Sequence, residues 1–449
     1  MNSKYKRYER YKLSGVEWLG EVPENWEVDR LRWTVLGCKN GIWGNEPDGV
    51  DDLVCVRVAD FDRTKFRVMI DKPTVRAVTP GERRGRLLQQ GDLLLEKSGG
   101  GELQPVGAVM LFEHDTDAVC SNFVARMLVS DGFDSVFLTY LHAHLYASRV
   151  NTRSIKQTTG IQNLDSMAYL DERVACPPLT EQQAIADFLD RRTGAIDELI
   201  AKKERVIELL REKRTALISH AVTKGLNPDA KMKDSGINWL GEIPEHWKVK
   251  RLKRISKKIQ TGCTPPTAQE YYYEDGTISW YGPGNFGDNL ILGEASKLIN
   301  ESAIKEGVAR LFEAGSTMIV AIGATIGKVG YIDKPASSNQ QITAVAPNIA
   351  KVLGKFLAYQ LKRLEQVLKG IAPNTTLPIM DQQKIGCLVI AIPPISEQQA
   401  ITDFLDRETS KIDALTAKVK EAIEKLKEYR TALISAAVTG KIDVRGCKN

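Results

Sequence analysis

Several features that assign a protein to a common class are missing from these 449 residues. No apolar run approaches the roughly 20 residues that a membrane-spanning helix needs, and no apolar stretch typical of a signal peptide follows the charged N-terminus. The seven cysteines form no C-x-x-C pair, which argues against a disulfide framework or a zinc site. The formal net charge is only +5, so any basic binding surface must be local. We therefore expect a cytoplasmic protein with reduced thiols and no membrane contact.

Signs of catalysis are missing as well. Residues 323–329 resemble a phosphate-binding P-loop, but the glycines are one residue too close and Val329 replaces the Ser/Thr that would hold magnesium. His142 and His144 are not accompanied by the further ligands that a metal site requires. We expect no catalytic residue and no metal on this chain.

What the chain does contain is an internal duplication. Residues 179–223 read LTEQQAIADFLDRRTGAIDELIAKKERVIELLREKRTALISHAVT and align without a gap to residues 395–439, ISEQQAITDFLDRETSKIDALTAKVKEAIEKLKEYRTALISAAVT. A shorter pair lies upstream, SGVEWLGEVPENWEVDRL at 14–31 and SGINWLGEIPEHWKVKRL at 235–252. Such self-similarity indicates tandem half-molecules. It predicts four segments: variable regions 1–176 and 233–392, a central helical repeat with linker 177–232, and a C-terminal helical repeat 393–449.

Each repeat is predicted to be one long helix. Thr180 with Gln183, and Ser396 with Gln399, follow a proline pair as a capping box would. Beyond them apolar residues recur at spacings of three and four, as in a coiled-coil seam. A helix of about 40 residues would be about 60 Å long. The predicted seam residues are Ile196, Leu199, Val206, Leu210, Leu217, Ile412, Leu415, Val419, Leu426 and Leu433.

The apolar stripe of each helix must be buried, and the other copy is the nearest partner. Two copies of one surface pair naturally about a two-fold axis, which makes the helices antiparallel. Parallel packing would also bury both stripes and stays open at this point. The predicted fold is α+β: two mixed domains joined by two long helices that form an antiparallel coiled coil with pseudo-two-fold symmetry.

The variable regions show short β-rich runs among glycine-rich turns, and few helices. Predicted strands lie at 53–58, 93–95, 106–112, 318–322 and 329–332, and predicted helices at 137–150 and 352–369. The tryptophans of the W-L-G-E-x-P-x-x-W segments are interpreted as a structural corner packed into each domain.

Loops rich in amides, hydroxyls and aromatic rings occur in both variable regions. Asn and Gln can pair with adenine, whereas Arg and Lys suit guanine and phosphate. Ordinary solvated turns have the same composition, so both interpretations remain open from the residues alone. The candidate DNA-binding residues are Lys39, Asn40, Trp43, Arg57, Arg63, Lys97, Ser98, Asn122, Gln157, Thr158, Gln260, Thr261, Tyr272, Trp280, Tyr281, Asn339, Gln340, Asn374 and Thr375.

Taken in order, these motifs resemble the specificity subunit of type I restriction–modification systems over essentially the whole chain. The most specific parts are the two EQQAIxDFLD helices and the segments WLGEVPENW and WLGEIPEHW; GDLLLEKSGGG, AVCSNF, TGCTPPT, ISWYGPGNF, GATIGKVG and SSNQQ add to them. The resemblance implies two target-recognition domains, each reading part of a bipartite site in double-stranded DNA, and a non-catalytic chain. Because the variable regions differ, the site should be asymmetric.

The resemblance also implies partners. Two methyltransferase subunits would dock on the helices, and two restriction subunits would join them. S-adenosylmethionine, ATP and Mg²⁺ are expected on those partners and no cofactor on this chain. The candidate docking residues are Asp190, Arg191, Asp406 and Arg407. Two alternatives remain: a two-headed coiled-coil adaptor that binds proteins, and an enzyme whose glycine-rich loops hold phosphate.

Overall fold

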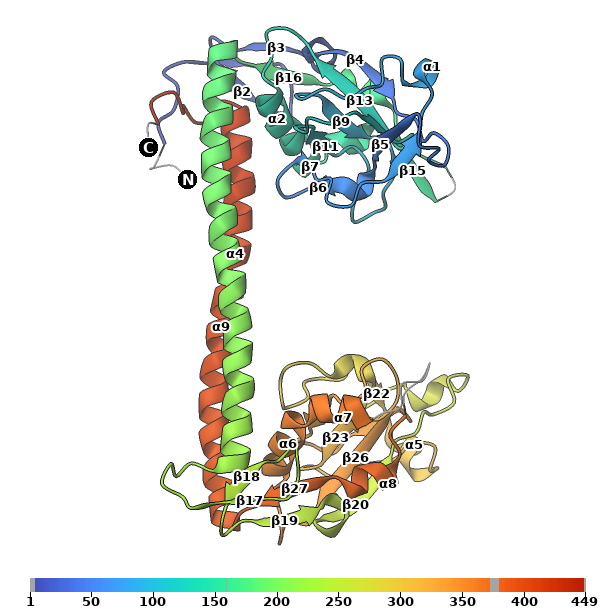
Figure 1. The fold of residues 1–449 in the computed structure, drawn as a ribbon, viewed down its shortest axis with the longest axis vertical. Helices are drawn as coiled ribbons and strands as arrows, with labels where there is room; N and C mark the ends of the chain where they lie inside the picture. The colour runs from blue at the N-terminus through green and yellow to red at the C-terminus, as the bar shows by residue number, and fades with distance from the viewer. Residues whose placement is uncertain (1–4, 159, 372–378, 448–449) are drawn as a thin grey trace. The chain divides into compact units, whose positions relative to one another are not determined.

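The computed structural model describes residues 5–158, 160–371 and 379–447. Its contacts divide the chain into two compact units: unit 1 is Met1–Lys203 with Glu421–Asn449, and unit 2 is Glu204–Lys420. Each unit contains one variable region and one end of each long helix (Figure 1). The compact units thus cut across the four predicted segments, because every unit takes residues from both repeats.

The two repeats form the longest helices, α4 (Leu179–Lys224) and α9 (Ile395–Val438) (Figure 1). In unit 1, Ile196 near the start of α4 shares a core with Leu433 near the end of α9. In unit 2, Ala221 near the end of α4 shares a core with Leu405 near the start of α9. Each unit joins the start of one helix to the end of the other, so the predicted antiparallel pairing is confirmed.

The helix seam is shifted by one residue from part of its prediction. The residues that are buried or half-buried as predicted are Ile196, Leu210, Leu217, Ile412, Val419, Leu426 and Leu433. Leu199, Val206 and Leu415 are instead 43%, 41% and 47% exposed, so their prediction as seam residues is wrong. The neighbouring residues Ile200, Ile207 and Thr416 are the more buried ones.

The cause is a charged residue in the seam of each helix. Arg214 and Arg430 are 9% and 8% exposed. Arg214 lies 3.4 Å from Asp413, and Arg430 lies 2.9 Å from Asp197. The two pairs are reciprocal, since each joins an arginine of one repeat to an aspartate of the other. A prediction based on apolar spacing leaves out a buried, ion-paired arginine. It therefore assigns the seam to the adjacent row of helix residues.

The helix starts also differ from their prediction. The backbone N–H groups of Glu181 and Gln182 donate to Pro178 O, at 2.8 and 2.9 Å, so α4 begins before Thr180 and the predicted capping box is wrong. A buried glutamine acts there instead. The Gln182 side chain donates from Nε2 to Pro177 O at 2.8 Å. Gln398 of α9 donates in the same way to Pro393 O at 2.9 Å.

The domain of unit 1 is built on two sheets. The strand order of the larger is β4-β13-β9-β11-β7-β6, and that of the smaller is β12-β5-β8. Their bounds are β4 Val35–Asn40, β13 Val124–Val129, β9 Leu93–Glu96, β11 Val109–Leu111, β7 Arg67–Val68, β6 Phe61–Asp62, β12 Ala118–Cys120, β5 Asp52–Val56 and β8 Val75–Ala77. Helix α2 (Ser135–Ala147) lies against β11 and is almost wholly buried.

The domain of unit 2 is also built on two sheets. Their strand orders are β20-β26-β23-β24 and β22-β21-β25. Their bounds are β20 Ser256–Thr261, β26 Ile342–Pro347, β23 Thr317–Val320, β24 Val329–Tyr331, β22 Lys297–Ile299, β21 Ile278–Tyr281 and β25 Ser337–Ser338. The helices of this domain are α5 Glu301–Lys305, α6 Gly354–Arg363, α7 Glu365–Ile371 and α8 Gln382–Cys387.

These two sheet systems share one topology despite their dissimilar sequences. In both, a central antiparallel pair (β13-β9 and β26-β23) is flanked by the first strand of the sheet (β4 and β20) on one side and by a strand that lies between the central two in sequence (β11 and β24) on the other. In both small sheets, one neighbour of the middle strand is parallel and the other antiparallel. The predicted strands at 53–58, 93–95, 106–112, 318–322 and 329–332 fall on β5, β9, β11, β23 and β24.

The W-L-G-E-x-P-x-x-W segments form the predicted corner. Each folds into a short hairpin, β1-β2 (Tyr11–Leu13, Glu21–Pro23) and β17-β18 (Met232–Asp234, Glu242–Pro244). Trp26 and Trp247 are fully buried. The Trp247 Nε1–H donates to Glu397 Oε1 of α9 at 3.1 Å. In unit 1, Asn25 Nδ2 donates instead to Glu181 Oε2 of α4 at 3.2 Å. Both corners therefore attach their domain to the start of a long helix.

Candidate nucleic-acid interface

A glycine closes the edge strand of the large sheet in each domain. Gly41 N donates to Val124 O, and Gly262 N donates to Ile342 O, both at 2.9 Å. A Cβ on Gly41 would lie 2.1 Å from Cys120 O, and one on Gly262 would lie 2.3 Å from Ser338 O. Only glycine allows this close approach of two backbones. The residues just before each glycine are thereby held beside the loop that follows β12 or β25.

In unit 1 this closure gathers the predicted polar residues into one surface, called tip 1 below and defined by Lys39, Asn40, Lys97, Ser98 and Asn122. Lys97 Nζ donates to Asn40 Oδ1 at 2.6 Å, and Lys97 N donates to Phe123 O at 2.8 Å. Ser98 Oγ donates to Asn163 Oδ1 at 2.6 Å, on strand β15 (Ile161–Leu164). Asn122 is exposed beside them.

The cations at tip 1 interact with neutral oxygens. Lys39 Nζ donates to Arg84 O at 2.8 Å, and Arg86 Nε donates to Asn40 O at 3.1 Å. Lys97 also has an amide oxygen as its partner. Among the described residues none of the three cations forms an ion pair, so their charges remain available to an anionic ligand. The composition alone did not single out Arg86, which reaches tip 1 from a separate segment.

Arg57 and Arg63 are placed differently. Arg57 forms an ion pair with Asp60 at 2.9 Å, and Arg63 forms one with Glu96 at 2.8 Å. Burial raises the pKa of Glu96, while its hydrogen bond with Arg63 opposes that rise. Since a carboxylate already pairs with each of these arginines, both offer less charge to a phosphate than the cations of tip 1.

The other predicted residues of the first domain flank tip 1. Trp43 is 40% exposed, and the Arg76 guanidinium lies 4.8 Å from the centre of its ring. Gln157 and Thr158 lie on β14 (Ile155–Thr158), which pairs with β15. The backbone of this hairpin adjoins Ser98, because β10 (Ser98–Gly99) also pairs with β15.

The corresponding surface of unit 2, tip 2, is defined by Gln260, Thr261, Thr264, Asn339 and Gln340. Thr264 Oγ1 donates to Gln340 Oε1 at 2.5 Å, and the Thr261 and Thr343 hydroxyls lie 3.0 Å apart. Asn339 Nδ2 donates to Gln341 Oε1 at 3.0 Å. A cavity of about 390 Å³, lined by Thr261, Gln340 and Gln382 among others, opens beside these groups. Arg310 donates to Thr261 O, as Arg86 donates to Asn40 O at tip 1. Tip 2 thus offers amides and hydroxyls where tip 1 offers two lysines.

The sequence of this chain is similar to sequences of known proteins. Residues 244–425 match the model of the type I restriction modification DNA specificity domain. The putative type I restriction enzyme MjaX specificity subunit of Methanocaldococcus jannaschii is 22% identical over 435 residues, covering 95% of this chain and 96% of that protein. The EcoR124I/EcoR124II specificity subunit of Escherichia coli is 26% identical over 269 residues, covering 57% of this chain and 59% of that protein.

Over nearly its whole length the chain is similar to type I restriction–modification specificity subunits, and residues 244–425 match their DNA specificity domain.

Two solved structures have the same fold as this chain. One chain, from a study of complex assembly and conformational transition in the type I R-M system, aligns with a TM-score of 0.72 at 17% identity, over 93% of this chain and 98% of that one. The HsdS subunit from Thermoanaerobacter tengcongensis aligns with a TM-score of 0.51 at 17% identity, over 94% and 98%.

Two predicted contact residues lie in the core of unit 2. Tyr272 and Tyr281 are 3% and 5% exposed. The Tyr272 hydroxyl donates to Glu306 at 2.6 Å, and the Tyr281 hydroxyl donates to Gly293 O at 2.7 Å. Buried rings cannot stack on bases, so these two predictions are wrong. The aromatic composition of the segments reflected packing.

Three predicted contact residues of the second domain remain: Trp280, Asn374 and Thr375. Trp280 is half-buried, and its Nε1–H donates to Cys263 O at 3.1 Å. Asn374 and Thr375 lie outside the described residues.

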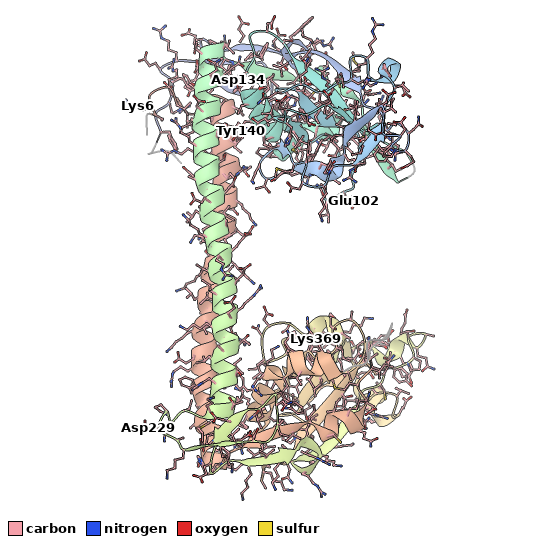
Figure 2. All side chains as sticks on the ribbon, in the orientation of Figure 1. Lys6, Glu102, Asp134, Tyr140, Asp229 and Lys369 are labelled. Carbon is pink, nitrogen blue, oxygen red and sulfur yellow. The ribbon has the colours of Figure 1, made fainter. Side chains whose placement is uncertain are left out.

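The predicted docking residues have two different environments. Tyr140 of α2 donates to Asp190 at 2.7 Å, and Tyr359 of α6 donates to Asp406 at 2.8 Å (Figure 2 labels Tyr140). Both aspartates therefore join a recognition domain to its helix. Arg191 and Arg407 are exposed, and their role in docking stays a prediction.

Within the described part of the chain, every helix is too short or too polar to span a membrane. The same residues contain no group of three or more His, Cys, Asp or Glu side chains that could hold a metal ion.

Proposed function

We propose that this chain reads an asymmetric, bipartite site in double-stranded DNA as the non-catalytic subunit of a type I restriction–modification complex. The observation that carries the proposal is one scaffold present twice with different polar groups at its tip. The two lysines of tip 1 suit phosphate and guanine, whereas the amides of Gln260 and Gln340 at tip 2 suit adenine. Two unlike half-sites follow from two unlike tips.

The proposed partners are two methyltransferase subunits and two restriction subunits, which would supply S-adenosylmethionine, ATP and Mg²⁺ sites while this chain binds no cofactor. The outward faces of α4 and α9 are the proposed docking surface. Leu199, Val206 and Leu415 on these faces are more than two-fifths exposed, and an exposed apolar row favours a protein partner. The seven free cysteines fit the cytoplasmic location that we propose for the complex.

Methylome sequencing of cells that carry the chain with its methyltransferase tests the proposal. The expected result is methylated adenine in a motif with two different half-sites and a fixed gap. A palindromic motif would contradict the assignment of unlike tips, and an absence of any motif would contradict DNA recognition by this chain.

The helices should set the gap. Insertion of one heptad after Lys203 and another after Lys420, at the boundary of the units, adds about 10.5 Å of helix and should lengthen the preferred gap by about 3 base pairs. The matched control places seven residues in the linker at Asn227, where the helices are unchanged and the gap should be unchanged. Retained binding with an unaltered gap in the helix variant would refute this role.

A two-headed protein-binding adaptor is the remaining alternative. A mobility-shift assay with the methyltransferase added separates the two functions, because only a DNA reader retains one duplex sequence over others. The chain alone should bind weakly and with strong salt dependence.

A further inference from the structure

Unit 2 contains a cavity between its domain and the long helices. Its volume is about 450 Å³, within the range of small-molecule sites. Arg211 and Arg214 of α4 line one side, and Asp413, Thr416 and Lys420 of α9 line another. The third side is the segment 285–293, which follows β21 and leads back to the sheet at Ile291.

Arg214 is the most deeply placed cation in this cavity. It is 9% exposed, and its Nε has no hydrogen-bond acceptor among the described residues. Its closest carboxylate oxygen, on Asp413, lies 3.4 Å away. A buried charged donor without an acceptor destabilises the fold. An oxyanion in the cavity would remove that destabilisation.

The equivalent arginine of unit 1, Arg430, also has an Nε without an acceptor among the described residues, but its guanidinium makes contacts that fill the joint. Arg430 donates from Nη2 to Thr64 O at 2.6 Å and lies 5.0 Å from the centre of the Phe66 ring. Phe66 adopts a φ of 58°, a conformation that a bulky residue rarely accepts, and this conformation accompanies the contact. In unit 2 the corresponding segment leaves open the space that Thr64 and Phe66 fill in unit 1.

The charge in the cavity is positive after its ion pairs are counted. Arg211 lies 3.5 Å from Asp288, and Arg214 pairs with Asp413, so each carboxylate already faces an arginine. Lys420 has no ion pair among the described residues and is exposed at the rim. Asn285, Asn289 and Thr416 add neutral hydrogen-bonding groups. Phosphate oxygens, which accept several charged hydrogen bonds at once, match this set of donors.

We propose that this cavity binds a small phosphate-bearing group through Arg214, Arg211 and Lys420. The bound anion completes the joint between the second domain and the helices, as Thr64 and Phe66 complete it in unit 1. The group is either a free phosphate ester or a phosphate of bound DNA. Binding of a free phosphate ester does not depend on DNA recognition by this chain, whereas binding of a DNA phosphate rests on the proposed function.

Titration of the purified full-length chain with inorganic phosphate and with AMP, followed by calorimetry, tests the free form. We expect saturable sub-millimolar binding that Arg211→Gln and Lys420→Gln each weaken about tenfold, the effect of losing one charged hydrogen bond. Arg214→Gln should abolish it. Both tenfold variants alter exposed side chains, so they should fold normally, and circular dichroism checks this. Arg430→Gln, in the closed joint of unit 1, is the matched control and should leave the affinity unchanged.

The DNA form is tested in the complex assembled with the methyltransferase. If free phosphate and AMP do not bind, Arg211→Gln and Lys420→Gln should weaken DNA binding equally across sequences and lower its salt dependence. That outcome supports the site with the DNA backbone as its source. The proposal is overturned if neither ligand binds and DNA affinity is also unaltered, or if phosphate binding is the same in all variants.

Discussion

Tip 1 carries the ammonium groups of Lys39 and Lys97, whereas tip 2 carries amides and hydroxyls. A guanidinium lies at both tips, since Arg86 donates to Asn40 O and Arg310 donates to Thr261 O. Lys39 and Asn40 precede Gly41 as Gln260 and Thr261 precede Gly262, and each glycine makes the same main-chain hydrogen bond. The two domains therefore differ most where side chains leave the scaffold and least where backbone meets backbone. A recognition domain that keeps its backbone scaffold while its tip side chains change can bind a new target with the same fold.

The comparison extends to the helix that packs below each sheet. Tyr140 of α2 and Tyr359 of α6 make the same hydrogen bond to the long helices. Two and four residues later, α2 carries His142 and His144, which are 0% and 8% exposed, whereas α6 carries Leu361 and Arg363. The same tyrosine–aspartate hydrogen bond thus lies beside two buried histidines in unit 1 and beside a leucine and an arginine in unit 2.

The largest expected effect comes from the two closing glycines. Gly41→Ala should destabilise unit 1, and Gly262→Ala unit 2, by more than about 3 kcal/mol, because a methyl group cannot share space with a carbonyl oxygen and the strand must move. Denaturant unfolding measures the loss, and hydrogen exchange assigns it to a unit. Gly284→Ala, where a Cβ meets nothing within 4 Å, is the matched control. Equal stability of Gly41→Ala and its control would mean that the strand ends are not pinned.

The second largest effect should be a difference between the two units in how much stability each loses at acidic pH. Burial lowers the pKa of His142 and of His144 to about 4, below the value of about 6.5 in an unfolded chain. Between these values the unfolded state binds protons that the folded state does not, so stability is complete above pH 6.5 and falls as pH decreases. The slope is about 1.4 kcal/mol per pH unit for each histidine.

Hydrogen exchange at pH 7 and pH 5.5 measures this difference for each unit. Unit 1 should lose on the order of 2 kcal/mol more than unit 2, since ordinary carboxylates titrate mainly below this range. A variant with His142→Leu and His144→Leu should lose the extra pH dependence. An identical pH response in the double variant would show that other groups cause it.

The smallest effect should distinguish the two tips in DNA binding. Lys39→Gln, Arg86→Gln and Lys97→Gln should each reduce the salt slope of binding by about 0.9 in the assembled complex, as expected for one phosphate contact. Gln260→Ala and Gln340→Ala should leave the slope unchanged and relax the preferred sequence of one half-site. Binding assays over a salt series with matched and mismatched duplexes check both. A steeper change at tip 2 than at tip 1 would reverse the assignment.

The sequence was sufficient for the parts that depend on repetition and periodicity. The two helices, their antiparallel pairing, the buried Trp26 and Trp247, and several strands follow from spacing and duplication. The common topology of the two domains did not follow, because residues such as Lys39 and Gln260 share a position but no chemistry. Only main-chain pairing shows that they correspond.

At the site, residue type was a weaker guide. Four of its candidates, Lys39, Asn40, Lys97 and Ser98, lie together in the structure, and their role in DNA binding stays a prediction. Residue type could not tell the buried Tyr272 from an exposed ring, because burial depends on strands distant in the chain. It also missed Arg214 and Arg430, as a charged residue fits a helix seam only when the facing aspartate is known.

The buried glutamines at the helix starts have a consequence for how such a chain changes over generations. Gln182 accepts from Asp134 N and donates to Gly132 O, and Gln398 accepts from Leu353 N and donates to Lys351 O. Every one of these partners is a peptide group, present whatever side chain the position carries. Substitutions in a recognition domain therefore leave these hydrogen bonds possible. A domain with an unrelated sequence but the same backbone path can attach to the long helix through the same glutamine.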